Sequence, residues 1–187
     1  MRVIAGKARR LPLKTPSGMD TRPTTDRIKE TLFNMLQDEL YEVNFLDLFS
    51  GSGGIGIEAL SRGAAKAWFV EQNRNAAAVI QENLAFTHLH DQAEVMVTSA
   101  VSAIMMLQGR VKFHVVFMDP PYGKELEKEI LGHPAFLSIL EDNALVIVEA
   151  DLNTELLPEE IPGLHILKEK IYKTNKHIFL EKDSVER

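Results

Sequence analysis

Apolar positions along the chain fall into two kinds of run that alternate from residue 28 onward. Residues 28–40 carry leucine, isoleucine and phenylalanine at helical spacing and predict an amphipathic helix, with Pro23, Thr24 and Thr25 as start signals. Short runs that are apolar almost throughout predict buried strands at 45–49, 67–71, 93–97, 113–119 and 144–150. Helical patterns separate or follow them at 57–63, 73–86, 102–107 and 124–140, the last interrupted at Gly132 and Pro134.

Buried strands that alternate with helices are typical of a doubly wound α/β fold, in which a mostly parallel, Rossmann-like sheet is covered on both faces. The segments 164–172 and 176–182 predict an antiparallel hairpin near the C-terminal end. A chain of 187 residues without an internal repeat or linker fits one domain, 1–187. We expect this domain to consist of a short arm, 1–22, and a core, 23–187.

The composition excludes several protein classes. With 45% hydrophobic residues and no apolar run near the roughly 20 residues that span a bilayer, the chain is predicted to be soluble and globular. The absence of cysteine excludes disulfides, thiolate metal sites and a cysteine nucleophile. The histidines are scattered without metal-ligand spacing, so no metal is predicted. The first ten residues lack the apolar core of a signal peptide, and we expect a cytoplasmic location.

Charge is distributed unevenly along the chain. Residues 1–29 contain eight Lys or Arg and two acidic residues, so this segment carries a net charge of +6 and the remainder −12. A basic arm on an acidic body suggests a localised surface for an anionic partner such as nucleic acid. A solvated basic tail is the alternative interpretation.

A glycine-rich segment, GSGGIG at 51–56, follows the first predicted strand and fits the pattern G-x-G-x-x-G. Ligands of open α/β sheets bind at the carboxyl ends of the strands, where this chain has Asp47, Glu71 and Asp119. Glu71 lies 20 positions after Gly51, where a carboxylate can accept both hydroxyls of a ribose. The pattern favours a cofactor that contains a nucleoside, with tight helix packing as the alternative reason for the glycines.

The position of Asp47 helps to distinguish between two candidate cofactors. A dinucleotide and S-adenosylmethionine both suit a glycine-rich turn. Because Asp47 precedes the glycines, its carboxylate could meet the ammonium of an amino acid rather than a pyrophosphate, which favours S-adenosylmethionine. A dehydrogenase also needs a second binding half, for which this chain has little room.

The fourth predicted strand, 113–119, runs into DPPY at 119–122. Proline cannot donate a ladder hydrogen bond, so the strand is expected to end at Asp119 and to leave its carboxylate, with Tyr122, beyond the sheet edge. An ordinary loop carboxylate that caps the following turn is the alternative for Asp119.

These motifs together resemble a known family. DLFSGSGGIG at 47–56, Glu71 and DPPY are similar to class I S-adenosylmethionine-dependent methyltransferases that modify exocyclic amino groups. RVIAGKARRLPL at 2–13 and TRPTTDRIKETLFNML at 21–36 narrow the resemblance to the RsmD type of bacterial small-subunit ribosomal RNA guanine-N2 methyltransferases, over nearly the whole chain. Adenine-N6 enzymes share DPPY, so an adenine-N6 nucleic-acid methyltransferase remains an alternative. A small NAD-dependent oxidoreductase and a catalytically silent RNA-binding module are further alternatives.

The resemblance implies S-adenosylmethionine as cofactor and ribosomal RNA, free or in the small subunit, as partner. The catalytic residues that it implies are Asp119, Pro120, Pro121 and Tyr122. The cofactor-binding residues that it implies are Asp47, Phe49, Gly51, Gly53, Gly56, Glu71 and Ser99, the last in a place where many relatives have an acidic or amide residue. The nucleic-acid-binding residues are Arg2, Lys7, Arg9, Arg10, Lys14 and Arg22. The resemblance also suggests that Arg22, Thr24 and Thr25 lie near the cofactor or the RNA.

The chemistry of an exocyclic amine explains the DPPY segment. The amine nitrogen shares its lone pair with the purine ring, so it is a poor nucleophile until both N–H groups are held out of conjugation. Asp119 is expected to accept one N–H and the carbonyl of Pro120 the other, while Tyr122 offers a ring on which a flipped base can stack. The absence of cysteine is consistent, because methylation of cytosine at carbon 5 generally needs a cysteine nucleophile.

Overall fold

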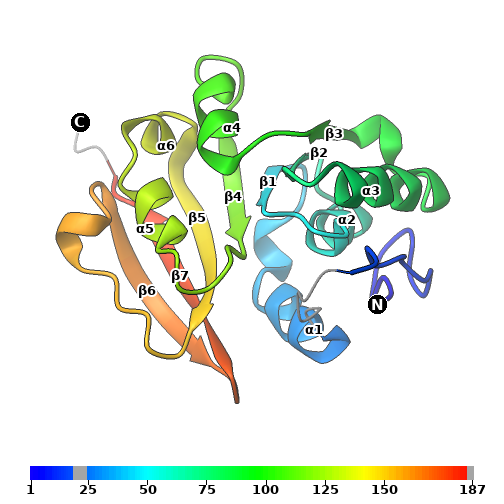
Figure 1. Ribbon diagram of the computed structural model, residues 1–187, viewed down its shortest axis with the longest axis horizontal. Coiled ribbons are helices and arrows are strands. Elements are labelled where there is room, and N and C mark those ends of the chain that lie inside the picture. Colours follow the sequence, from blue (N-terminus) through cyan, green and yellow to red (C-terminus); the bar gives the residue numbers. More distant parts are fainter. Residues whose placement is uncertain (19–24, 185–187) are drawn as a thin grey trace.

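The computed structural model describes residues 1–18 and 25–184, which form a seven-stranded sheet with helices on both faces (Figure 1). The strand order is β3-β2-β1-β4-β5-β7-β6, and among these seven strands β7 runs in the direction opposite to the other six. The strands are β1 (Asn44–Leu48), β2 (Lys66–Val70), β3 (Ala93–Met96), β4 (Phe113–Met118), β5 (Leu140–Asp151), β6 (Leu164–Ile171) and β7 (Asn175–Lys182). The predicted doubly wound sheet with an antiparallel C-terminal hairpin is confirmed.

The helices lie in two layers. The layer with the arm contains α1 (Asp26–Met35), α2 (Gly54–Ser61) and α3 (Arg74–Phe86). The opposite layer contains α4 (Ala100–Leu107), α5 (Leu126–Leu131) and α6 (Pro134–Ser138). Short 3-10 helices occupy Gln37–Glu39, His90–Gln92 and Pro158–Glu160. No helix of the described ranges is long and apolar enough to cross a membrane.

Both faces of the sheet are buried, which is why the central strands are apolar almost throughout. Alternate side chains of one strand enter different cores: Phe45 packs on the side of α1 to α3, and Leu46 on the side of α4 to α6. Phe45 stacks against Phe33 of α1 with the ring centroids 6.5 Å apart. The sheet is therefore a rigid platform whose carboxyl edge is left for the loops.

The first helix is shorter than its apolar pattern predicts. Thr25 caps its start by accepting the N–H of Ile28 at 3.3 Å. The other predicted start signals, Pro23 and Thr24, lie outside the described residues. The helix ends at Met35, and a tight 3-10 turn at Gln37–Glu39 follows. Leu40 is still buried after this turn, so the apolar repeat in the sequence extends beyond the end of the α-helix.

The first 14 residues pack against the core. Val3, Ala8 and Leu13 are buried among the side chains of α1 to α3, and Arg2 forms an isolated antiparallel bridge with Pro12. Over this segment the chain is thus a folded arm and not a loosely solvated tail.

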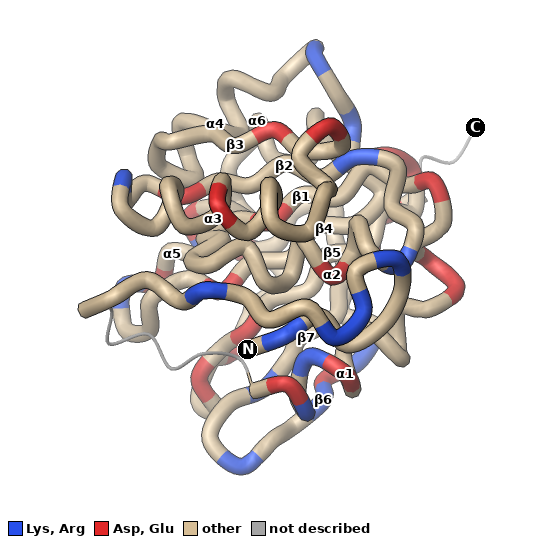
Figure 2. Tube along the Cα trace, turned by 90° about the vertical axis from the view of Figure 1, so that its right-hand side faces the viewer, with Lys and Arg blue, Asp and Glu red and all other residues tan. Residues whose placement is uncertain are grey.

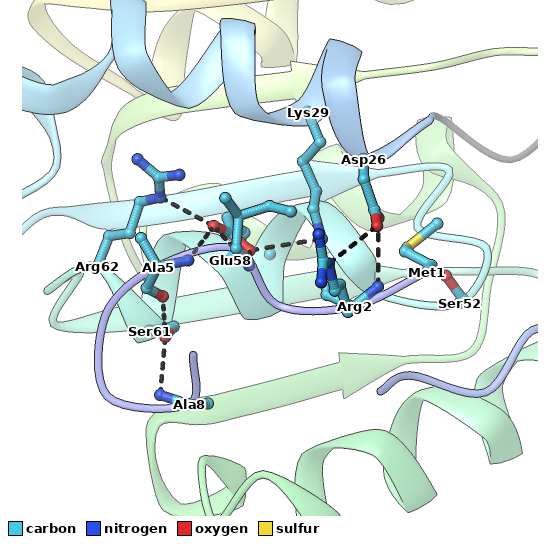
Figure 3. A network of polar contacts seen from close by, with 12 residues as sticks. Met1, Arg2, Ala5, Ala8, Asp26, Lys29, Ser52, Glu58, Ser61 and Arg62 are labelled. Atoms are coloured by element: carbon cyan, nitrogen blue, oxygen red, sulfur yellow. Dashed lines mark hydrogen bonds and ion pairs between the residues drawn. The ribbon is translucent and has the colours of Figure 1, made fainter. Parts of the chain in front are cut away.

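A buried ion cluster anchors this arm, as Figure 3 shows. The Glu58 carboxylate of α2 is fully buried and accepts the backbone N–H groups of Ile4 and Ala5 at 2.9 and 3.1 Å. It also pairs with Lys29 of α1 at 3.4 Å and with Arg62 at 2.9 Å. Burial lowers the pKa of Lys29 in spite of the neighbouring Glu58 carboxylate. Removal of Glu58 would leave the buried Lys29 ammonium with only the Arg2 carbonyl as hydrogen-bond acceptor and the N–H groups of Ile4 and Ala5 without their acceptor, so the arm depends on this residue.

Candidate functional site

The carboxyl ends of β1, β2 and β4 meet at one edge of the sheet (Figure 1). Leu48, the last residue of β1, pairs with Val70 of β2 and with Met118 of β4. The residues that follow these three strands therefore leave the sheet at the same level. The structure thus brings together Glu71, the glycine segment and the DPPY segment, as the sequence predicts.

Asp47 holds the turn after β1. Its Oδ2 accepts the N–H of Gly56 at 3.0 Å, and its backbone carbonyl accepts the Ser50 hydroxyl at 2.6 Å. The Asp47 side chain therefore ties the strand to the first turn of α2. At 1% exposure the residue is enclosed by the turn. Its contact with the ammonium of a cofactor stays a prediction.

The surroundings of Asp47 change its proton affinity. Burial raises the pKa of Asp47 to about 7, against the stabilising hydrogen bond from Gly56, and the nearby Glu71 carboxyl raises it further. Near neutral pH this carboxyl is therefore protonated in part of the molecules. Either protonation state leaves an oxygen that can accept the Gly56 N–H.

Glu71 lies directly after β2 and is 8% exposed. Its Oε2 accepts the N–H of Gly51 at 2.9 Å, and its Oε1 accepts the N–H of Asn73 at 2.8 Å. Each carboxylate oxygen has a second lone pair, so both can still accept a hydroxyl. The bonds to Gly51 and Asn73 fix the carboxylate in one orientation beside the glycine turn.

The glycines of the turn serve different needs. Gly51 has φ +57°, and a Cβ built on it would meet no atom within 4 Å, so its backbone is open to a ligand. A Cβ on Gly56 would instead collide with the ring of Phe69, so that glycine allows α2 to pack on β2. Gly56 thus fits the packing interpretation of the motif, whereas contact between Gly51 and a cofactor stays a prediction. Phe49 adopts φ 59°, a left-handed conformation that is rare outside glycine and marks a tightly constrained exit from β1.

The DPPY segment follows β4 directly. This strand ends at Met118, one residue before the end that the sequence predicts. Pro120 is buried, whereas Pro121 is exposed and Tyr122 is 51% exposed. Asp119 is partly exposed, and its carboxyl accepts no hydrogen bond from the residues that the structure describes. An exposed aromatic ring therefore lies three residues from a carboxyl group that has acceptor capacity left.

Burial raises the pKa of Asp119 well above its usual range, and the carboxyl groups of Glu149 and Asp47 raise it further. The charged form of Asp119 is thus costly until a partner with N–H donors or positive charge arrives. This behaviour is typical of a group with a functional role and less expected of a loop residue that only caps a turn.

Ser99 lies in the loop between β3 and α4, where its hydroxyl oxygen caps α4. It accepts the N–H of Ser102 at 3.2 Å. A contact between Ser99 and a cofactor stays a prediction, and helix capping is the role that the structure gives this residue.

The predicted nucleic-acid-binding residues lie along the arm, where Figure 2 shows Lys and Arg close together in space. Arg2 pairs with Asp26 at 3.3 Å and Lys14 with Glu82 at 2.6 Å, and the Lys7 ammonium donates to Gln92 at 3.4 Å. Arg9 and Arg10 are exposed and form no ion pair within the described part of the chain. Arg22 lies outside the described residues.

Sequence reasoning missed a fourth acid at a strand end. Glu149 lies near the end of β5, is 7% exposed and is held by Asn175 and His177 of β7. A usable signal existed, because ALVIVEA at 144–150 is an apolar strand with an acid near its end, as the second and fourth predicted strands have at theirs. A second missed residue is Lys29, a buried cation on the apolar side of α1.

The described residues contain no group of three or more His, Asp or Glu side chains that could hold a metal ion.

Comparison with known proteins places the chain in a family. The family described as Conserved hypothetical protein 95 matches residues 1–181. Ribosomal RNA small subunit methyltransferase D of Haemophilus influenzae is 38% identical over 173 residues, 91% of this chain and 88% of that protein. The enzyme of the same name from Escherichia coli K12 is 37% identical over 156 residues, 83% of this chain and 77% of that protein.

Solved structures agree with this result. The Escherichia coli protein yhhF, described as a candidate methyltransferase, superposes with a TM-score of 0.83 at 32% identity over 99% of both chains. A hypothetical protein of Thermus thermophilus has a TM-score of 0.81 at 28% identity, again over 99% of both chains. The fold is that of the class I methyltransferases, and the chain belongs to the ribosomal RNA small subunit methyltransferase D family, whose members depend on S-adenosylmethionine.

Proposed function

We propose that this protein transfers a methyl group from S-adenosylmethionine to the exocyclic N2 amine of a guanine in small-subunit ribosomal RNA. The observation that carries the proposal is the pairing of β1 with β4, through which the glycine turn and the DPPY segment leave the sheet side by side. One loop has features of a nucleoside site and the other has free acceptor capacity. Family membership supports ribosomal RNA as the substrate.

The cofactor side is argued from Glu71 and Gly51. The Glu71 carboxylate has one lone pair left on each oxygen, which suits the two adjacent hydroxyls of a ribose. The open backbone at Gly51 suits close approach of a ligand to the turn. S-adenosylmethionine, when bound, supplies a methyl group on a sulfonium. These residues would hold it beside the DPPY loop, since β1 and β4 are neighbours in the sheet.

The substrate side is argued from Asp119 and its neighbours. The Asp119 carboxylate accepts one N–H of the amine and the Pro120 carbonyl accepts the other, which takes both hydrogens out of the plane of the ring. Two consecutive prolines limit the motion of these acceptors. The exposed ring of Tyr122 offers a stacking surface for a base extruded from its helix.

The arm is the part of the protein that we expect to bind RNA phosphates. Arg9 and Arg10 supply exposed positive charge on a segment whose apolar residues are buried, so the charges are held in place by the fold. Small-subunit RNA is found in the cytoplasm, and we expect the enzyme to work there.

Mass spectrometry of nucleosides tests the proposal. Small-subunit RNA is isolated from cells without the gene, incubated with purified protein and isotopically labelled S-adenosylmethionine, and digested. We expect label in N2-methylguanosine. Label in N6-methyladenosine would replace the guanine assignment with the adenine alternative. Assembled small subunits and free RNA, compared in parallel, identify which of the two is the substrate.

Calorimetry on the protein alone separates the methyltransferase from the oxidoreductase alternative. S-adenosylhomocysteine should bind in a saturable way, and NAD should give no heat of binding. Binding of NAD without binding of S-adenosylhomocysteine would overturn the assignment of the glycine turn.

A further inference from the structure

A row of polar side chains crosses three neighbouring strands beside the DPPY segment. Met118 of β4 pairs with Val148 of β5, and the two strands are parallel. The residues that follow this pair, Asp119 and Glu149, therefore lie side by side. Glu149 pairs in turn with His177 of β7. The alternation of side chains along each strand places all three on the face that carries α1 to α3.

The Glu149 carboxylate is fixed from the side away from Asp119. Its Oε1 accepts the side-chain amide N–H of Asn175 at 2.8 Å, and its Oε2 lies 3.2 Å from Nε2 of His177. His177 is fully buried and cannot swing away, since its ring packs edge-on against Phe117 at 6.0 Å and against Tyr172 at 5.1 Å. The carboxylate thus has one available orientation beside Asp119.

The titratable groups around this row are few. Asp119 faces Glu149 on β5 and Asp47 on β1, and Glu149 faces His177 on β7 and Tyr172 after β6. Nδ1 of His177 and the hydroxyl of Tyr172 are buried without a hydrogen-bond partner among the described residues. Keeping such groups buried costs stability, which is the pattern expected of a cluster retained for function.

The Glu149 carboxyl contributes to the raised pKa of two neighbouring groups, Asp119 and Tyr172. Burial raises the pKa of Asp119, and Glu149 is the next cause. Burial also raises the pKa of the Tyr172 hydroxyl, again with the Glu149 carboxyl as the second cause. A carboxyl group on the adjacent strand disfavours the ionisation of Asp119 in this partly buried position. Glu149 is therefore placed to make Asp119 a stronger base.

We propose that Glu149, held by Asn175 and His177, is a positioning residue that tunes the charge of Asp119 for methyl transfer. This inference rests on the proposed acceptor role of Asp119. In the reaction, the amine lone pair forms the N–C bond, and the electron pair of the broken C–S bond stays on sulfur. The nitrogen then carries an extra positive charge and must release a proton. Asp119 takes up that proton, and the Glu149 carboxylate beside it makes this uptake more favourable.

Glu149→Gln provides the test, because it removes the charge and keeps the shape. The Gln oxygen can still accept from Asn175, and His177 can accept the new amide N–H by changing tautomer. Without the neighbouring charge, Asp119 ionises at lower pH. The ratio of the single-turnover rate at about pH 6 to that at about pH 8 should therefore rise by roughly three- to tenfold, with unchanged affinity for S-adenosylhomocysteine.

Two variants complete the experiment. Asp142→Asn removes an exposed carboxylate from the opposite end of β5 and should leave the ratio at the wild-type value. Glu149→Asp retains the charge and should stay closer to wild type than Glu149→Gln. A uniform loss of rate at both pH values in Glu149→Gln would mean that Glu149 is only structural and would overturn the proposal.

The proposal remains testable if Glu149→Gln does not fold. In that case the side-chain carboxyl carbon of Asp119 is followed by NMR in the wild-type protein, with Asp119→Asn used for its assignment. Titration of Asp119 in the ordinary aspartate range would overturn the inference. If Asp119→Asn and Asp119→Ala had no effect on transfer, the proposed function of the DPPY segment would fail instead, which is a separate result.

Discussion

The glycine turn and the DPPY segment lie side by side, yet they differ in how completely their polar groups are paired. In the glycine turn, Glu71 receives a backbone N–H on each oxygen and Asp47 ties the strand to the helix. At the DPPY segment, the Asp119 carboxyl accepts no hydrogen bond from the described residues. Under the proposed function, the half that binds the cofactor is therefore built before any ligand arrives, and the half that binds the substrate is completed by the base that is methylated.

The strongest test of this difference is Asp119→Ala. If Asp119 acts only when the amine is in place, the variant should bind S-adenosylmethionine normally and lose roughly a hundredfold or more in methyl transfer. Asp119→Asn should be milder, because an amide oxygen still accepts one N–H. Single-turnover transfer to authentic RNA and calorimetry with the cofactor measure the two effects separately. Transfer by the Ala variant within a few-fold of wild type would mean that Asp119 only caps a turn.

Asp47 predicts a pH dependence of stability that arises in the glycine turn. Its folded-state pKa of about 7 lies above the unfolded value, so between about pH 4 and pH 7 the folded protein holds a proton that the unfolded chain has released. Its contribution to the free energy of unfolding is therefore fully present at low pH and is lost as the pH rises through 7. Between about pH 5 and pH 7 this loss amounts to about 2 kcal/mol.

Asp47→Asn should remove that loss and keep an acceptor for the Gly56 N–H. Urea unfolding at about pH 5 and pH 7 measures the free energy of unfolding of wild type and variant. Asp142→Asn, which removes an exposed carboxylate, serves as the matched control. An equal pH dependence in wild type and Asp47→Asn would show that the Asp47 carboxyl is already ionised well below pH 7.

Glu71→Ala should weaken cofactor binding at least tenfold. The variant loses hydrogen bonds to a charged group, each worth about 1.5–3 kcal/mol, and also leaves the N–H groups of Gly51 and Asn73 without their partner. Calorimetry with S-adenosylhomocysteine measures the affinity, and Glu82→Ala on the exposed side of α3 is the control. Unchanged affinity would place the ribose elsewhere.

The sequence predicts the fold well, because an apolar run bounded by turn residues is a local signal. It places three acids near strand ends for the same reason: Asp47 is next to last in its strand, and Glu71 and Asp119 directly follow theirs. What it does not predict is pairing across strands. Glu149 and His177 are 28 residues apart, and only the register of β5 and β7 makes them neighbours.

The sequence also does not predict how deeply each polar side chain is buried or what it bonds to. The sequence predicts Asp47 as a ligand for a cofactor ammonium, and the structure adds that its carboxyl is enclosed and bonded to Gly56. Basic charge in the arm can be counted, but the folding of the arm onto α2 depends on Glu58 and Lys29, which come from two different helices. Burial and desolvation are properties of packed elements, so a one-dimensional pattern cannot contain them.

The smallest effect is expected for substitutions in the arm. They should change the affinity for RNA without changing the affinity for the cofactor, and so separate the two binding regions. Replacing Arg9, Arg10 and Lys14 together with Gln should weaken RNA binding by roughly several-fold at moderate salt and reduce its salt dependence, because fewer counterions are released. Cofactor affinity should not change, since these side chains take no part in the glycine turn. The control variant, Lys170→Gln with Lys173→Gln, removes positive charge from the hairpin at the far edge of the sheet. Lys14 already pairs with Glu82, so Arg9 and Arg10 should account for most of the loss. If both variants lost RNA affinity equally, net charge alone would attract the RNA, and the arm would have no specific role in binding it.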